Sequence, residues 1–169
     1  MPALGWRVLT DRVRIPTEAF STEETGVDYG MYMTGLTDPP AMESFEQEYQ
    51  RRPISMGEGV SELEELAQAF STLELQAMYQ LDDGGRPVVE ATYRHEDKPI
   101  VIFRQPKERP IQFTGYETEP VTVDSEQCLM AQNERYCAYT FATAQEQYVV
   151  IGERDDPMPE QIVRHLLSR

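Results

Sequence analysis

The chain has 169 residues, of which 40% are hydrophobic and 27% are charged. This length fits a single domain, residues 1–169, which can bury a sizeable core without a metal or a disulfide. The chain carries 15 basic and 30 acidic residues and a net charge of −15, which disfavours binding to nucleic acid and to anionic lipid. The pattern indicates a self-repelling, soluble surface, or an acidic inhibitor that occupies a basic groove.

No stretch of the sequence approaches the roughly 18 to 20 apolar residues of a membrane-spanning helix. The segment from Met1 to Trp6 has neither the basic start nor the apolar stretch of a signal peptide. We therefore expect no direct membrane insertion by this stretch of chain. If the protein works in the cell envelope, we expect a signal or an anchor to have been trimmed.

Residues 1–71 predict a strand followed by two helices. Residues 5–15 alternate imperfectly, which is typical of an edge strand, and residues 29–34 predict another short strand. Asp38 followed by two prolines predicts a helix start. Ser61 with a glutamate three residues later has the capping-box form and begins the second helix.

Residues 72–152 predict a curved antiparallel β-meander, because the hydrophobic period changes from 3.6 to 2 at this point. Leu73 to Leu81 alternate as one half-buried strand, and Ile100 to Arg104 are almost continuously apolar, which indicates a central strand. Residues 156–169 predict a C-terminal helix. The expected fold is α+β, with about seven or eight strands, two N-terminal helices and a short C-terminal helix packed on one face.

The two cysteines flank a turn expected at residues 132 and 133. A two-residue loop there would place Cys128 directly opposite Cys137, in a pair of residues with a short Cα separation. That register favours a disulfide and hence an oxidising compartment. The alternative is two buried thiols on the face of Met130, Tyr139 and Phe141, which would be compatible with the cytoplasm.

Candidate catalytic groups are scarce. His95 stands in a charged turn and His165 on the last helix, and neither has a metal-ligating partner at helical or hairpin spacing. The sequence contains no Gly-x-Ser-x-Gly motif and no phosphate-binding loop. We expect no catalytic centre, no metal and no cofactor, and hence a protein that is not an enzyme.

A curved sheet covered by helices can leave an apolar groove between the two layers. Six aromatic residues are candidates to line such a groove: Tyr79, Tyr93, Phe103, Tyr139, Phe141 and Tyr148. The alternative is that the same residues simply form the core.

Three segments and the short final helix carry a family resemblance: Val121 to Val123, the hairpin strand Arg135 to Phe141, and Tyr148 to Gly152. On this pattern, residues from about 72 to 168 resemble the extracytoplasmic domain of unknown function found in some bacterial anti-sigma factors and lipoproteins. That domain is similar to the lipoprotein-carrier fold, an open half-barrel capped by helices. The resemblance implies a non-enzymatic cell-envelope domain that recognises a protein or an apolar ligand, and it transfers no functional residue.

Two other hypotheses remain open at this point. One is a cytoplasmic cup for hydrophobic ligands, similar to the plant-allergen and lipid-transfer superfamily, because the predicted order of elements is alike. The other is an acidic inhibitor or immunity protein that blocks a basic partner. The location is expected to be extracytoplasmic, or cytoplasmic if the cysteines are free.

Overall fold

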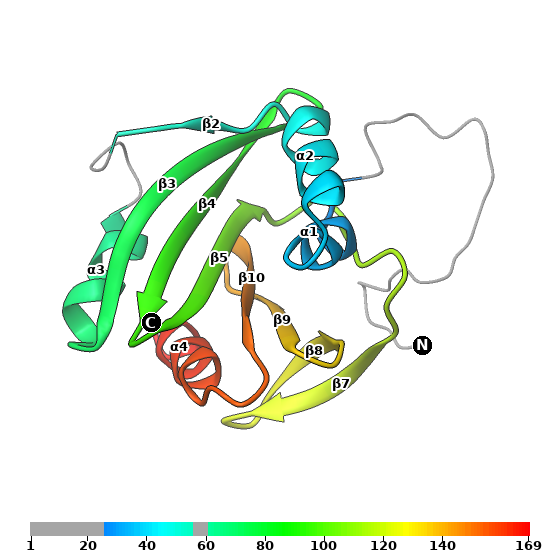
Figure 1. Ribbon diagram of the computed structural model, residues 1–169. Helices are drawn as coiled ribbons and strands as arrows, with labels where there is room; N and C mark the ends of the chain where they lie inside the picture. Colours follow the sequence, from blue (N-terminus) through cyan, green and yellow to red (C-terminus); the bar gives the residue numbers. More distant parts are fainter. Residues whose placement is uncertain (1–25, 56–60) are drawn as a thin grey trace.

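The computed structural model describes residues 26–55 and 61–169 (Figure 1). The strand expected over residues 5–15 lies outside the described residues. The described residues form four helices and an eight-stranded antiparallel sheet, together with a separate two-stranded parallel sheet. The expected α+β class with a curved antiparallel sheet is confirmed.

The large sheet has the strand order β2-β3-β4-β5-β10-β9-β8-β7. Its strands are β2 Arg52–Pro53, β3 Leu73–Asp83, β4 Arg86–His95, β5 Lys98–Pro106, β7 Thr118–Val123, β8 Glu126–Gln132, β9 Tyr136–Ala142 and β10 Glu146–Glu153. Two runs of hairpins therefore meet where β5 pairs with β10. The small parallel sheet consists of β1 Val27–Asp28 and β6 Ile111–Gln112.

The helices cover both faces of the sheet. Their bounds are α1 Tyr29–Gly35, α2 Pro39–Glu48, α3 Ser61–Ala69 and α4 Met158–Leu167. Helices α3 and α4 pack into one core, and α1 and α2 pack into a second core across the sheet. The expectation that all helices lie on one face is wrong, because the central strands are apolar on both sides: Val149 belongs to the second core and Val150 to the first.

Strand β3 contains a β-bulge between Leu75 and Ala77. An extra residue in one strand changes which face the later side chains point to. Leu73 and Leu75 therefore pack against the α3–α4 core, whereas Leu81 belongs to the α1–α2 core. The single alternating stripe predicted from Leu73 to Leu81 is wrong for this reason.

The short strand predicted over residues 29–34 is instead helix α1. Asp28 caps it, because its Oδ1 accepts hydrogen bonds from the N–H of Gly30 at 3.1 Å and of Thr114 at 3.0 Å. A Cβ on Gly30 would lie 2.3 Å from the carbonyl oxygen of Thr114. Packing against a segment more than 80 residues away therefore stabilises this helix.

The predicted helices at Asp38, at Ser61 and at the C-terminus are confirmed as α2, α3 and α4. Phe45 in α2 and Tyr49 directly after the helix are both buried. Asp156 binds the start of α4, accepting a hydrogen bond from the N–H of Met158 at 2.9 Å. Both local signals and packing thus agree on these elements.

Thr140 provides a test of the packing in the sheet. Within residues 26–55 and 61–169, its hydroxyl is the one buried side-chain polar atom without a hydrogen-bond partner. Thr140→Val is expected to raise the free energy of unfolding by about 1 kcal/mol, since it removes an unsatisfied polar group at constant shape. Urea unfolding followed by circular dichroism measures the change.

Thr92→Val is the matched control. The Thr92 hydroxyl donates a hydrogen bond to the carbonyl oxygen of Ala77 at 3.3 Å, so this substitution is expected to lower stability by about 0.5 to 1 kcal/mol. Equal losses in both variants would contradict the packing described here.

Candidate functional site

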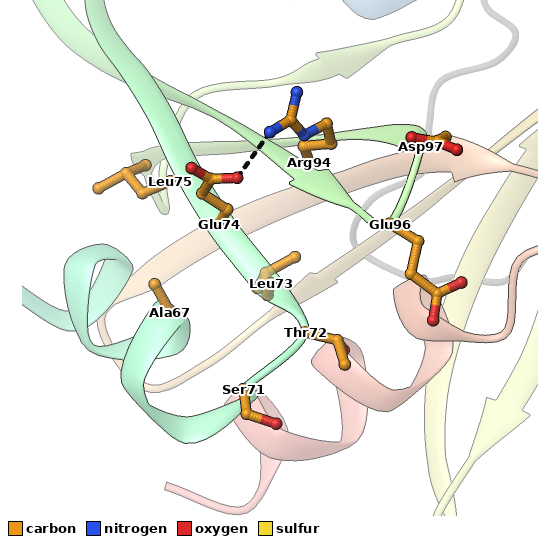
Figure 2. Close-up of a pocket in the computed structure, with 9 residues that line it drawn as sticks. All are labelled: Ala67, Ser71, Thr72, Leu73, Glu74, Leu75, Arg94, Glu96 and Asp97. Carbon is orange, nitrogen blue, oxygen red and sulfur yellow. Dashed lines mark hydrogen bonds and ion pairs between the residues drawn. The ribbon is translucent and has the colours of Figure 1, made fainter.

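An open depression of about 720 Å³ lies where the end of α3, the start of β3 and the β4–β5 turn meet (Figure 2). Its lining comes from three separate segments of the chain. The lining residues are Ala67, Ser71, Thr72, Leu73, Glu74, Leu75, Arg94, Glu96 and Asp97.

Local chain geometry builds the two sides of this depression. The turn after α3 is tight, since the N–H of Leu73 donates to the carbonyl of Phe70 at 3.0 Å. It leaves the side chains of Ser71 and Thr72 exposed. On the other side, Glu96 has a φ of +60°, a left-handed conformation that a tight two-residue hairpin turn requires.

Carboxylates dominate the charge of the depression. Glu74 and Arg94 face each other across β3 and β4 and form an ion pair at 2.9 Å. Glu96 and Asp97 are exposed, and no Arg or Lys of the described chain pairs with either of them. The depression therefore offers two carboxylates that no cation of the described residues neutralises.

A buried hydrogen-bonding contact between His95 and Asp156 supports the β4–β5 turn. His95 Nδ1 lies 3.0 Å from Asp156 Oδ2, and both side chains are almost fully buried. On its other side, His95 Nε2 lies 4.0 Å from the Glu96 carboxylate. The sequence pattern indicated only a turn position for His95, because its partner is 61 positions away and only the fold brings the two together.

A second polar cluster lies on the opposite face of the sheet. Glu90 has a fully buried side chain, and its carboxylate accepts hydrogen bonds from two nitrogens of Arg51 at 2.8 and 3.1 Å. The Arg51 guanidinium also lies 3.5 Å from the centre of the Tyr79 ring. Burial raises the pKa of Glu90 above its ordinary value, although Arg51 opposes the shift. These contacts hold β2 on the sheet.

The six aromatic residues predicted to line one groove are divided between the two faces of the sheet. Tyr93, Phe141 and Tyr148 are buried in the α3–α4 core, and Tyr139 packs at its edge. Phe103 belongs to the α1–α2 core. Tyr79 lies on that face as well, because it pairs with Glu90, which in turn pairs with Phe103. The structure therefore does not bring the six together.

The aromatic residues on the α3–α4 side are engaged in contacts within the core. The rings of Phe141 and Tyr148 stack with centres 5.5 Å apart. The Tyr93 hydroxyl donates to the carbonyl oxygen of Leu63 in α3. Burial raises the pKa of both Tyr139 and Tyr148 to about 12. These side chains fill the space between sheet and helices.

The two cysteines are free and buried, and the predicted disulfide is wrong. The turn is longer than expected, because Asn133 Oδ1 accepts hydrogen bonds from the N–H groups of Arg135 and Tyr136. Cys137 consequently pairs with Gln132. Gln132 is four residues beyond Cys128 along β8, or roughly 13 Å at 3.3 Å per residue, which is too far for a disulfide.

Comparisons with protein-family models, with curated proteins and with solved structures gave no significant match. None of the described helices has both the length and the apolar character needed to cross a membrane. In the same residues, no group of three or more His, Cys, Asp or Glu side chains is placed to hold a metal. The proposals below therefore depend on geometry and charge alone.

The lining of the depression was not predicted from the sequence. The turn containing Glu96 and Asp97 was visible as a charged turn, and this was the available signal. Its position beside Ser71 and Thr72 depends on the pairing of Leu73 with His95 at the end of the β3–β4 ladder. That contact joins residues more than 20 positions apart.

The state of the thiols can be tested directly. Burial raises the pKa of both Cys128 and Cys137 from 9.0 to about 11, which lowers the reactive thiolate fraction about a hundredfold at pH 8. Both thiols are therefore expected to react with Ellman's reagent at least that much more slowly in the native protein than in urea. Two thiols per chain should be titrated in urea without reductant.

Cys137→Ser is the matched control and should leave one thiol. If the protein yields no thiols in urea and two thiols after reduction, the predicted disulfide between Cys128 and Cys137 would be supported.

The buried Glu90 allows a test by pH. Arg51→Leu is expected to lower the free energy of unfolding by about 3 kcal/mol at neutral pH, because it leaves a buried carboxylate without its cation. Without Arg51 the pKa of Glu90 rises further, so the loss should shrink as the pH falls through that pKa and the carboxyl becomes neutral. Urea unfolding over a pH series measures this.

Glu46→Gln is the control, because it removes only the partly exposed contact of Arg51, which is worth about 0.5 kcal/mol or less. The double variant Arg51→Leu/Glu90→Leu should recover much of the stability. A loss in Arg51→Leu that is independent of pH would contradict the assigned role of Glu90.

Proposed function

We propose that this protein is a non-enzymatic binding domain whose partner is a basic protein. The observation that carries the proposal is the distribution of charge. Outside residues 1–25 and 56–60 the chain has 12 basic and 25 acidic residues. At least nine of the basic side chains are already engaged in ion pairs with carboxylates of the same chain.

The acidic side chains left over are exposed and distributed over several elements. Without an Arg or Lys partner among the described residues are Asp38, Glu43, Glu48, Glu96, Asp97, Glu117, Glu119, Glu126 and Glu134. Such a surface attracts basic partners over a distance of about one Debye length and repels acidic ones. Complementary charge therefore supports a basic protein as the partner.

The packing of the core favours this proposal over a cup for apolar ligands. The side chains that would line such a cup are engaged: Tyr93 hydrogen-bonds to α3, and Phe141 stacks on Tyr148. Ile162 and Leu166 of α4 are buried in the same core. A ligand between sheet and helices would have to displace these contacts.

The free thiols bear on the proposed location. The argument for an oxidising compartment depended on a disulfide between Cys128 and Cys137, which are unpaired and far apart. Two buried free thiols are compatible with a reducing compartment. We accordingly propose the cytoplasm, the location expected if the cysteines are free, in preference to the cell envelope.

Capture experiments on lysate from the source cells test the proposed function. Immobilised full-length protein is expected to retain a stoichiometric partner of basic isoelectric point at 50 mM salt. The purified partner should bind at least about tenfold more weakly at 500 mM salt, because screening weakens exposed charge pairs. Isothermal titration calorimetry over a salt series measures this.

Two charge-reversal variants locate the electrostatic contribution to partner binding. Glu43→Lys/Glu48→Lys tests the surface of α2, and Glu117→Lys/Glu119→Lys tests the surface at the start of β7. A partner of acidic isoelectric point, or a complex unaffected by salt, would overturn the proposal.

A further inference from the structure

We infer that the depression between α3, β3 and the β4–β5 turn receives a lysine or arginine side chain of the partner. This inference rests on the proposed function and names the place where it acts. Its basis is the combination of an apolar floor with an anionic rim at one position on the surface.

The floor of the depression is apolar. Leu73 is 3% exposed, Leu75 is half-buried, and Ala67 contributes a methyl group from α3. The side chains of lysine and arginine carry three or four methylene groups that pack on apolar surface while their charged ends stay polar and hydrated. The floor is suited to this aliphatic part.

The rim of the depression is suited to a positive charge. Glu96 and Asp97 are adjacent, exposed and without an Arg or Lys partner in the described part of the chain. Figure 2 shows Thr72 and Glu96 together on the side nearest α4. A hydroxyl and a carboxylate at that position can both accept hydrogen bonds from an ammonium or a guanidinium group.

The positive charge already present in the depression does not oppose this. Arg94 is paired with Glu74 at 2.9 Å, so its guanidinium is neutralised within the site. An anionic ligand would have to compete with Glu74 for Arg94 and approach the carboxylates of Glu96 and Asp97. A cation meets no such cost, and the site therefore selects against phosphate or carboxylate ligands.

The rim is held in place before any ligand arrives. The pairing of His95 with the buried Asp156 at 3.0 Å anchors the β4–β5 turn to the start of α4. On the other side, the hydrogen bond from Leu73 to Phe70 fixes the turn after α3. Little conformational entropy is lost on binding when the receiving groups are already ordered.

The alternative mode of recognition is strand addition at an edge of the sheet. Strand β7 pairs only with β8 among the described strands. Its free edge is a poor site for strand addition, because Pro120 has no backbone N–H to donate. The start of β3 carries the bulge at Leu75 and Ala77, which also protects an edge from pairing. Insertion of a side chain is therefore the mode that this surface favours.

A small-molecule probe tests the site without the partner. Full-length ¹⁵N-labelled protein is titrated with N-acetyl-lysine methylamide in about 150 mM salt, close to physiological ionic strength, and followed by ¹H–¹⁵N correlation spectra. Saturable shifts are expected at Ser71 to Leu75 and at Arg94 to Asp97. N-acetyl-norleucine methylamide, which has an apolar side chain without the charge, should bind at least about tenfold more weakly.

Two variants with the same change of charge distinguish binding in the depression from nonspecific attraction to the acidic surface. Glu96→Gln/Asp97→Asn should weaken the lysine probe at least about fivefold, with the rest of the spectrum unchanged. Glu43→Gln/Glu48→Gln, on the exposed face of α2, should leave its affinity within about twofold, because α2 packs on the opposite face of the sheet from the depression. The single variant Asp97→Asn repeats the test if the turn is disturbed.

The outcomes distinguish the two proposals. Equal effects of both double variants, or shifts that spread over every acidic surface without saturation, would overturn the inference about the depression. The proposed function would survive that result if a salt-dependent basic partner is captured. A loss of partner affinity that is at least about fivefold larger in Glu96→Gln/Asp97→Asn than in Glu43→Gln/Glu48→Gln would support both.

Discussion

The pairing of β5 with β10 is the contact on which the rest of this fold depends. Both strands are apolar on both faces, and Ile100 to Phe103 are at most 5% exposed. A strand with two apolar faces is stable only when each face is covered. The two runs of hairpins therefore meet at these strands, and two helices pack on each side of the sheet (Figure 1).

Buried charges then determine where the outer elements attach. Arg109 forms two hydrogen bonds with Asp83 at 2.9 and 3.0 Å, and Gln105 donates to the carbonyl oxygen of Arg109 at 3.0 Å. A buried charge is tolerated when it is paired and hydrogen-bonded. These contacts tie the segment after β5 to the β3–β4 hairpin, just as the pair of Arg51 and Glu90 ties β2 to the sheet. The carboxylates in excess of these pairs lie on the surface.

This use of charge connects stability with the proposed function. Most arginines and lysines of the described residues already pair with carboxylates of the same chain, so few of them are left to offset the remaining exposed acids. In the depression beside α3, acids without an Arg or Lys partner among the described residues coincide with an apolar floor. A binding surface of this kind requires no catalytic residue.

Local patterns predicted much of the architecture. The change of period after residue 72 and the helix starts at Asp38 and Ser61 are signals within a few residues, and the elements follow them. Helix α1 was missed because its stability comes from contacts of Gly30 with Thr114, which no local pattern contains. The candidate site was missed for the same reason, since its lining comes from segments that only the β3–β4 pairing brings together.

The sequence by itself determined the class of fold, the net charge and the presence of the terminal helix. Only the tertiary structure decided the register of β8 against β9, the bulge in β3 and the distribution of helices over two faces. A turn one or two residues longer shifts every pair in a hairpin. For this reason Cys128 and Cys137, which the pattern placed opposite each other, are separate buried thiols.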